Sequence, residues 1–343
     1  MREKRKIKVL IIDDSLLFRE FISQEVRKDS GIVVVGTAAD PFDARDKIID
    51  LEPDVITCDI EMPKMNGIEF IRRLMPQYPL PAVIVSSLSD NVFEALNAGA
   101  VDFVVKPAIR TSNGMEGFIN ELIVKIKIAS MANVSLFKNS TLSQEIHSTN
   151  MEKADNVIIA IGASTGGTEA IFDIIHALPK DMPGIVIVQH MPPGFTKMYA
   201  NRLNNSCKLE VKEAETSDKI IKGRVLIAPG DKHLKIVRKS NAYFVECFEG
   251  EKVNGHKPSV DVLFNSAAEA CGSSAIGIIL TGMGYDGAKG LLKMKEKGAI
   301  TIGQDEKSCV VYGMPKVAYD IGGVSKQLPL KSIPEKICSL VYK

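Results

Sequence analysis

The sequence of 343 residues contains no tryptophan, and aromatic residues make up only 6% of it. No apolar run approaches the ~18 residues that a membrane-spanning helix needs, so we expect no direct membrane insertion. The six cysteines stand at positions 58, 207, 247, 271, 309 and 338 without a CxxC pair, which argues against a metal knuckle or a disulfide framework. These absences favour a globular chain with reduced thiols.

A strong charge of either sign is also missing. The formal net charge is +1, so the chain as a whole has no electrostatic reason to bind nucleic acid or an acidic membrane. The basic start MREKRKIK leads into a short apolar stretch and two aspartates, without the core and cleavage site of a signal peptide. We therefore expect a cytoplasmic protein that binds no nucleic acid.

What the sequence does contain is regular alternation of strand-like and helix-like segments, in two groups. From KVLIIDD to MEGFINELIVKIKIAS there are five β/α repeats. After the polar segment MANVSLFKNSTLSQEIHSTNMEKA, a second alternating pattern begins at VIIAIGAS and contains LKIVRKSNAYFVECFEG, which is typical of a β-hairpin. Such alternation predicts parallel sheets covered on both faces.

The predicted fold class is therefore α/β with two domains, as the length also favours. Residues 1–130 would form a doubly wound domain with a five-stranded parallel sheet. Residues 154–343 would form a second doubly wound α/β domain with a β-hairpin insertion, and residues 131–153 would link the two.

The motif VIIAIGASTGG, residues 157–167, is the first place where the sequence indicates chemistry. Its β-branched run predicts a buried strand, and its glycines allow a sharp turn into a helix over roughly residues 168–178. Ser164 would then stand exposed at the strand end, where a serine can act as a nucleophile. Backbone amides at the start of the helix would point at the same spot and could hold an oxyanion.

A dinucleotide-binding loop is a competing interpretation of the same motif. The order of strand, glycine-rich turn and helix is shared, but GASTGG fits GxGxxG badly because Ser164 stands where the second glycine belongs. The next strand ends in Gln189 and His190, not in the acid that would hold a ribose. These departures favour the nucleophile over a nucleotide site.

His190 is the preferred candidate for the general base. It ends the strand GIVIVQH, which puts it on the same sheet edge as Ser164, and the prolines after it stiffen the loop. His176 has apolar helical neighbours and is expected to pack as a structural residue. His233 and His256 lie in loops and could line the pocket, although neither terminates a predicted parallel strand.

For the carboxylate that orients the base, the segment IGIILTGMGYDGAKG offers Asp286 in a glycine-rich loop after a buried strand. Asp231 and Asp305 are rivals on position alone. A serine nucleophile needs an imidazole to take its proton, and a buried carboxylate to fix the other ring nitrogen. Ser164, His190 and Asp286 satisfy this requirement, but in an order that differs from the Ser, Asp/Glu, His order of α/β-hydrolases, so we do not expect that fold.

The first half has an acidic edge of its own. Its predicted strands end in Asp13 and Asp14, in Asp59, in Ser86 and in Lys106, and the ends of parallel strands meet at one edge of a sheet. Three carboxylates repel one another unless a cation lies among them, and such oxygen ligands suit Mg²⁺. The lysine and the serine could hold the oxygens of a phosphoryl group while Asp59 accepts it as an acyl phosphate.

With EMPKMNG after Asp59, residues 7–127 resemble the receiver domain of two-component response regulators. The resemblance implies that Asp59 is phosphorylated with the help of Mg²⁺ held by Asp13, Asp14 and Asp59. It also implies that a conformational switch is carried by Ser86, Phe103 and Lys106. Serine and phenylalanine at two of these positions depart from the commoner threonine and tyrosine, and both are frequent variants.

A receiver followed by GASTGG, QHMPPGFT, APGDKHL, KPSVDVLF and TGMGYDG makes nearly the whole chain resemble the CheB family of chemotaxis protein-glutamate methylesterases. The resemblance implies that Ser164, His190 and Asp286 form a catalytic triad that hydrolyses glutamate γ-methyl esters on chemoreceptors, releases methanol and needs no cofactor. Family members often deamidate receptor glutamines as well. The oxyanion hole or pocket would then involve Thr165, Gly166, Met283 and His256.

Regulation follows from joining a receiver to an esterase. The receiver would cover the cleft and leave it on phosphorylation by a chemotaxis histidine kinase. A phosphorylation-controlled binding module without turnover is the alternative function. A DNA-binding response regulator is disfavoured, because the second half shows β/α alternation without a basic recognition helix.

Overall fold

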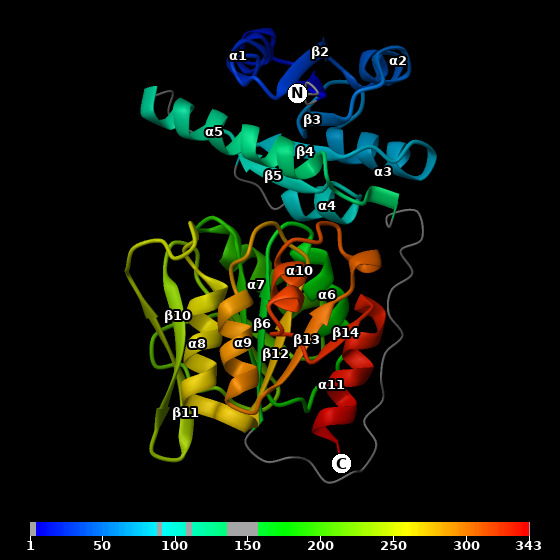
Figure 1. The fold of residues 1–343 in the computed structure, drawn as a ribbon. Helices are drawn as coiled ribbons and strands as arrows, with labels where there is room; N and C mark the ends of the chain where they lie inside the picture. The colour runs from blue at the N-terminus through cyan, green and yellow to red at the C-terminus, as the bar shows by residue number, and fades with distance from the viewer. Residues whose placement is uncertain (1–4, 88–90, 108–111, 136–156, 343) are drawn as a thin grey trace. The chain divides into compact units, whose positions relative to one another are not determined.

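The computed structural model describes residues 5–87, 91–107, 112–135 and 157–342. The chain divides into two compact units near residue 140 (Figure 1). Most of the predicted linker, from residue 136 onward, lies outside the described residues. None of the helices in the described ranges is long and apolar enough to cross a bilayer.

The first unit contains the predicted five-stranded parallel sheet, with strand order β2-β1-β3-β4-β5. Helices α1 and α5 pack against each other, as do α3 and α4. The side chains of Ser15, Asp40 and Asn66 accept hydrogen bonds from the first amides of α1, α2 and α3, which explains where these helices begin. The strands are β1 (Ile7–Ile12), β2 (Ile32–Ala38), β3 (Val55–Asp59), β4 (Ala82–Ser86) and β5 (Asp102–Val105). The helices are α1 (Leu16–Val26), α2 (Pro41–Leu51), α3 (Gly67–Gln77), α4 (Asn91–Asn97) and α5 (Ser112–Ala129).

The second unit is built on a seven-stranded sheet of order β14-β13-β12-β6-β7-β9-β8, in which every pairing is parallel. The predicted hairpin is present as β10 (His233–Lys239) paired antiparallel with β11 (Ala242–Phe248). The sheet strands are β6 (Ile158–Ala163), β7 (Gly184–Gln189), β8 (Glu210–Glu213), β9 (Arg224–Ile227), β12 (Ala275–Ile279), β13 (Ile300–Gln304) and β14 (Lys326–Leu328).

Helices cover both faces of this sheet. Helix α8 packs on β6, β7 and α9, while α6 packs with α7 and α11. The α-helices are α6 (Gly167–Ala177), α7 (Phe195–Ser206), α8 (Val260–Cys271), α9 (Ala288–Glu296), α10 (Met314–Asp320) and α11 (Ile333–Val341). Short 3-10 helices are η2 (Gly272–Ser274), η3 (Glu306–Ser308) and η4 (Leu330–Ser332).

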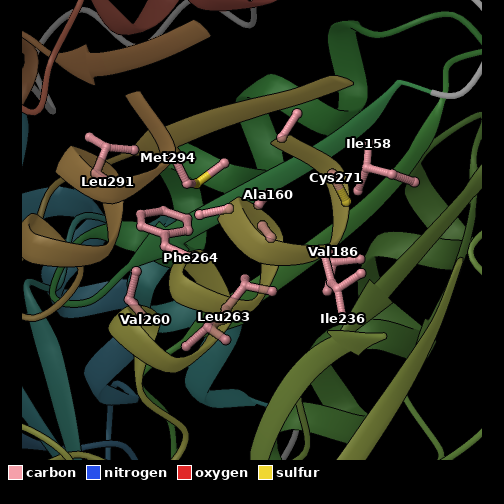
Figure 2. Close-up of a cluster of buried hydrophobic side chains, with 14 of the residues drawn as sticks. Ile158, Ala160, Val186, Ile236, Val260, Leu263, Phe264, Cys271, Leu291 and Met294 are labelled. Atoms are coloured by element: carbon pink, nitrogen blue, oxygen red, sulfur yellow. The ribbon is translucent and has the colours of Figure 1, made fainter. Parts of the chain in front are cut away.

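The core beneath α8 positions the start of that helix. Val260, Leu263 and Phe264 recur at helical spacing and are fully buried in one hydrophobic cluster with Ala160 of β6 (Figure 2). Burying a side chain of this size stabilises the fold by roughly 1.5–3 kcal/mol. The first turn of α8 is therefore held firmly at the carboxyl edge of the sheet.

Candidate functional site

Ser164 is the first residue after β6, and the sharp turn predicted around it is present. Gly166 adopts a left-handed conformation with φ 76°, and α6 starts at Gly167, close to the predicted residue 168. The Ser164 amide donates to the carbonyl of Thr281 at 3.0 Å, and its carbonyl accepts from the Gly167 amide at 2.7 Å. The serine is half-buried and tied by its backbone to the loop after β12.

The loop after β7 is tied to the same turn. The His190 amide donates to the carbonyl of Ala163 at 3.1 Å. The side-chain amide of Gln189 donates to the carbonyls of Ser164 at 2.9 Å and His190 at 3.2 Å. Three loops from different strand ends thus meet at Ser164, as expected at the carboxyl edge of a parallel sheet.

Two glycines make this close meeting possible. A Cβ on Gly282 would lie 2.6 Å from the Cβ of Ser164, and a Cβ on Gly167 would lie 2.6 Å from the Cβ of Ala163. Neither contact is sterically allowed, so Gly282 in TGMG and Gly167 in STGG are needed for the backbone segments to lie close together around Ser164.

His190 and Asp286 form a hydrogen-bonded pair in which Nε2 and Oδ2 are 2.9 Å apart. The two side chains are 7% and 1% exposed. Among the described residues, Nδ1 of His190 is buried and has no hydrogen-bond partner. Because Nε2 donates its hydrogen to the carboxylate, Nδ1 carries the free lone pair and can accept a proton. The ring nitrogens exchange the roles that they have in the familiar Ser-His-Asp arrangement.

Asp286 also receives hydrogen bonds from the segment around the start of α8. Oδ1 accepts from Asn254 Nδ2 and Ser259 Oγ, both at 2.8 Å, and Oδ2 accepts from the Val260 amide at 2.6 Å. Burial alone would raise the pKa of Asp286, but the hydrogen bonds from His190, Asn254 and Ser259 hold it well below its usual value. The carboxylate stays ionised and can stabilise an imidazolium.

The other predicted candidates occupy different positions. His233 is buried at the start of β10, where Nδ1 accepts from the Ser259 amide at 3.3 Å and Nε2 lies 2.8 Å from the Glu251 carbonyl. Asp231 is paired with Lys257 at 3.2 Å, and Asp305 accepts from the Ser308 amide at the start of η3. These residues support local structure instead of pairing with His190.

His256 does reach the predicted site. Its ring is stacked on that of His190 with centroids 3.7 Å apart and an angle of 8° between the planes. Burial, together with the neighbouring His190, lowers the pKa of His256 to about 4, so its imidazole is neutral at neutral pH. It therefore adds no positive charge beside the base.

Several amides around Ser164 are already used as donors. The amide of Ser164 donates to the carbonyl of Thr281, that of Gly167 to the carbonyl of Ser164, and that of Gly282 to the carbonyl of Val311. An oxyanion hole is predicted at the amides of Thr165, Gly166 and Met283. Their role stays a prediction.

Asn254 and Ser259 are residues that sequence reasoning missed. Both lie within a few positions of His256, and Asn254 is in an Asn-Gly pair that signals a tight turn. That signal predicts the turn but not its partner, because Asp286 is 32 residues further along the chain from Asn254.

The first unit gathers its predicted residues at the corresponding edge of its own sheet. Asp13, Asp14 and Asp59 each place a carboxylate oxygen within 4.8 Å of the others. Lys106 Nζ lies 2.8 Å from Asp13 Oδ2 and 2.6 Å from Asp59 Oδ2. Burial raises the pKa of Asp59, and the Lys106 ammonium opposes that shift only in part. This donor set fits a divalent cation.

The two remaining switch candidates are buried nearby in the same sheet. Ser86 ends β4 and is 3% exposed, and Phe103 in β5 is 4% exposed. Their assignment to a switch stays a prediction.

Comparisons with known proteins agree with this architecture. The family model described as CheB methylesterase matches residues 159–337, and the response regulator receiver domain model matches residues 9–113. The chain is 56% identical over 337 residues to protein-glutamate methylesterase/protein-glutamine glutaminase 2 of Syntrophomonas wolfei, covering 98% of each chain. The chain belongs to the CheB methylesterase family.

Other CheB relatives extend the likeness. The chain is 52% identical over 346 residues to the protein-glutamate methylesterase/protein-glutamine glutaminase of Syntrophotalea carbinolica, covering 98% of each chain. The crystal structure of the Thermotoga maritima CheB methylesterase catalytic domain is 45% identical, with a TM-score of 0.54, and the match covers 55% of this chain and all of that one. The resemblance stated from the sequence is confirmed, and the receiver precedes a CheB catalytic domain.

Proposed function

We propose that this chain is a phosphorylation-controlled esterase that hydrolyses glutamate γ-methyl esters on chemoreceptors at the cytoplasmic side. The observation that carries the proposal is the His190–Asp286 pair, whose free Nδ1 is presented at the sheet edge where Ser164 stands. The names of the CheB relatives supply the substrate class. The chemistry of the pair supplies the reaction type.

In the proposed first step, Ser164 Oγ attacks the ester carbonyl carbon and Nδ1 of His190 takes the hydroxyl proton. Asp286 stabilises the resulting imidazolium through the bond to Nε2. The tetrahedral intermediate then collapses, the bond to the methoxy group breaks, and His190 returns the proton so that methanol leaves. Water attacks the acyl-enzyme with the same base and restores the free serine.

The developing oxyanion needs fixed donors. We assign this role to the amides of Thr165, Gly166 and Met283, at the start of α6 and in the loop after β12. In other serine hydrolases, loss of one such donor costs about 2.7–4 kcal/mol of transition-state stabilisation.

Deamidation is the second reaction that the same site would carry out, since the relatives' names include glutaminase activity. A glutamine side chain presents a carbonyl of the same geometry as the ester. Attack by Ser164 would give the same acyl-enzyme, with ammonia leaving in place of methanol. We propose it as a property of the same triad.

The receiver would control this activity through phosphorylation of Asp59 by a chemotaxis histidine kinase. An oxygen of Asp59 attacks phosphorus, the bond to the donor histidine breaks, and an acyl phosphate forms. Asp13, Asp14 and Asp59 would hold Mg²⁺, which when bound neutralises charge on the phosphoryl oxygens. Lys106 would pair with a phosphoryl oxygen, and Ser86 and Phe103 would respond to it.

The test is hydrolysis of a methylated chemoreceptor fragment, followed by mass spectrometry. We expect the wild-type chain to remove methyl groups and Ser164→Ala to lose about 10⁴-fold or more in kcat, because the nucleophile is gone. Ser339→Ala is the matched control, since the Ser339 hydroxyl donates to the Lys336 carbonyl within α11. Ser164→Ala with a wild-type rate would exclude the proposed mechanism.

The same experiment addresses a phosphorylation-controlled binding module. Such a protein would retain the receptor fragment without changing its mass, and Ser164→Ala would affect binding alone. Methyl loss that depends on Ser164 excludes that alternative.

A further inference from the structure

The turn Val253–His256 lies against the His190–Asp286 pair and touches both members. Val253 and His256 exchange two backbone hydrogen bonds, of 3.1 Å and 2.9 Å. Between them, Asn254 and Gly255 have positive φ angles of 53° and 84°. Asn-Gly is the pair that favours this two-residue turn, so its side chains project from a fixed backbone.

Asn254 connects two carboxylates. Its Nδ2 donates to Oδ1 of Asp286 at 2.8 Å and to Oδ2 of Asp261 at 2.7 Å. Asp261 is in turn held by the Gly290 amide at 2.6 Å. The amide thus supplies a hydrogen to each of two neighbouring acids that would otherwise repel each other, and fixes the distance between them.

His256 acts on the other member of the pair. Its ring lies 3.7 Å from the His190 ring and within 8° of parallel, so it restricts tilting of the base. The titratable groups that face it are His190, Asp286 and Lys252. A neutral ring in this position can also stack with the imidazolium that His190 becomes during the reaction.

We propose that the turn Val253–His256 positions the catalytic pair, with Asn254 fixing the carboxylate of Asp286 and His256 fixing the ring plane of His190. Nδ1 of His190 would thereby be held in place at the sheet edge where Ser164 stands. This inference rests on the proposed esterase function. Both side chains are positioning residues, because they act through His190 and Asp286 and not on the substrate.

The experiment compares His256→Ala, His256→Phe and His256→Leu in the full chain on the methylated receptor fragment. We expect His256→Ala and His256→Leu to lower kcat about tenfold with KM changed less than about twofold, because alignment affects the chemical step more than substrate binding. A flat phenylalanine ring restores the stack, so His256→Phe should recover most of kcat. A purely structural role would not separate Phe from Leu, since both fill the volume.

Asn254→Asp tests the other contact. It places a third carboxylate beside Asp286 and Asp261, and we expect kcat to fall at least as far as in His256→Ala. The matched control is His176→Ala, which removes a ring stacked on Phe172 of α6 with centroids 5.4 Å apart, away from this pair. His176→Ala should keep the wild-type kcat.

Each outcome decides a separate point. A wild-type chain that leaves the methyl esters intact contradicts the esterase function itself. If the wild type is active and His256→Leu has the same kcat as the wild type or as His256→Phe, the proposed positioning role of the His256 ring is wrong. Thermal unfolding of every variant shows whether a loss of kcat comes from a loss of folded protein. If His256→Ala does not fold, the comparison of His256→Phe with His256→Leu still tests the proposal.

Discussion

Asp286 is a carboxylate that the protein keeps charged although it is 1% exposed. An isolated buried carboxylate would be protonated, since desolvation disfavours its charge. Four groups from the segment before and at the start of α8 donate to it, in addition to His190. The folded chain therefore holds a fixed negative charge beside the base before substrate arrives, which lowers the reorganisation needed during reaction.

His256 is kept neutral instead of charged, because burial lowers its pKa to about 4 from an ordinary value of 6.5. Between these values the unfolded chain binds the proton and the folded chain does not, so stability is lost as the pH falls from 6.5 through 4. His256→Phe removes this titration. When the pH is lowered from about 7.5 to about 5, we expect the free energy of unfolding of the wild type to fall by about 2 kcal/mol more than that of His256→Phe.

Thermal unfolding of both proteins at the two pH values measures this difference through their melting temperatures. About 2 kcal/mol corresponds to a few degrees for a chain of this size. A difference between the two melting temperatures that does not change with pH would show that His256 titrates normally.

At the scale of elements, two glycines allow the start of α8 to pack closely on the sheet. A Cβ on Gly162 in β6 would lie 2.1 Å from Cγ1 of Val260, and a Cβ on Gly287 would lie 2.5 Å from the same atom. Val260 therefore fits between two glycines, and its amide donates to Asp286. Packing of one helix on the strand before Ser164 thereby sets the position of the third triad candidate.

Gly162→Ala should disturb both stability and activity for this reason. Overpacking of a filled core costs about 1–3 kcal/mol, and displacement of Val260 would move Asp286 relative to His190. We expect a lower melting temperature and a lower kcat on the methylated fragment. Gly117→Ala is the matched control, because the site in α5 has no atom within 4 Å of the added Cβ. Equal melting temperatures and kcat for Gly162→Ala and wild type would contradict this account.

The strands, the hairpin and the strand ends were predictable because they depend on short patterns. A β-branched run followed by glycine locates β6 and the turn at Ser164 within a few residues, and parallel topology then brings strand ends together. The bonds from Asn254 and Ser259 to Asp286 span 32 and 27 residues. They depend on how α8 packs, and local spacing carries no signal for that. Nor does spacing show which nitrogen of His190 faces the carboxylate.

For the whole molecule, the two units have the same construction and different chemistry. Each collects its polar side chains at the carboxyl edge of a parallel sheet, where the first gathers three carboxylates and a lysine and the second gathers serine, histidine and aspartate. An acyl phosphate at Asp59 would change the charge around Lys106, and so bias the receiver between two conformations. The receiver would then control the esterase if substrate reached the catalytic residues less readily in one of these two conformations.

Control of this kind predicts that the receiver inhibits the esterase until Asp59 is phosphorylated. We expect Asp59→Asn to abolish activation by a small phosphodonor such as acetyl phosphate while leaving the basal rate unchanged, because an amide cannot form the acyl phosphate. The catalytic segment 154–343 should hydrolyse the methylated fragment about tenfold faster than the unphosphorylated full chain, which corresponds to a coupling of about 1.4 kcal/mol. The crystal structure of the Thermotoga maritima CheB methylesterase catalytic domain, which matches 55% of this chain, supports the choice of this segment. If segment 154–343 is slower than the full chain, the receiver activates the esterase directly, and release from inhibition is wrong.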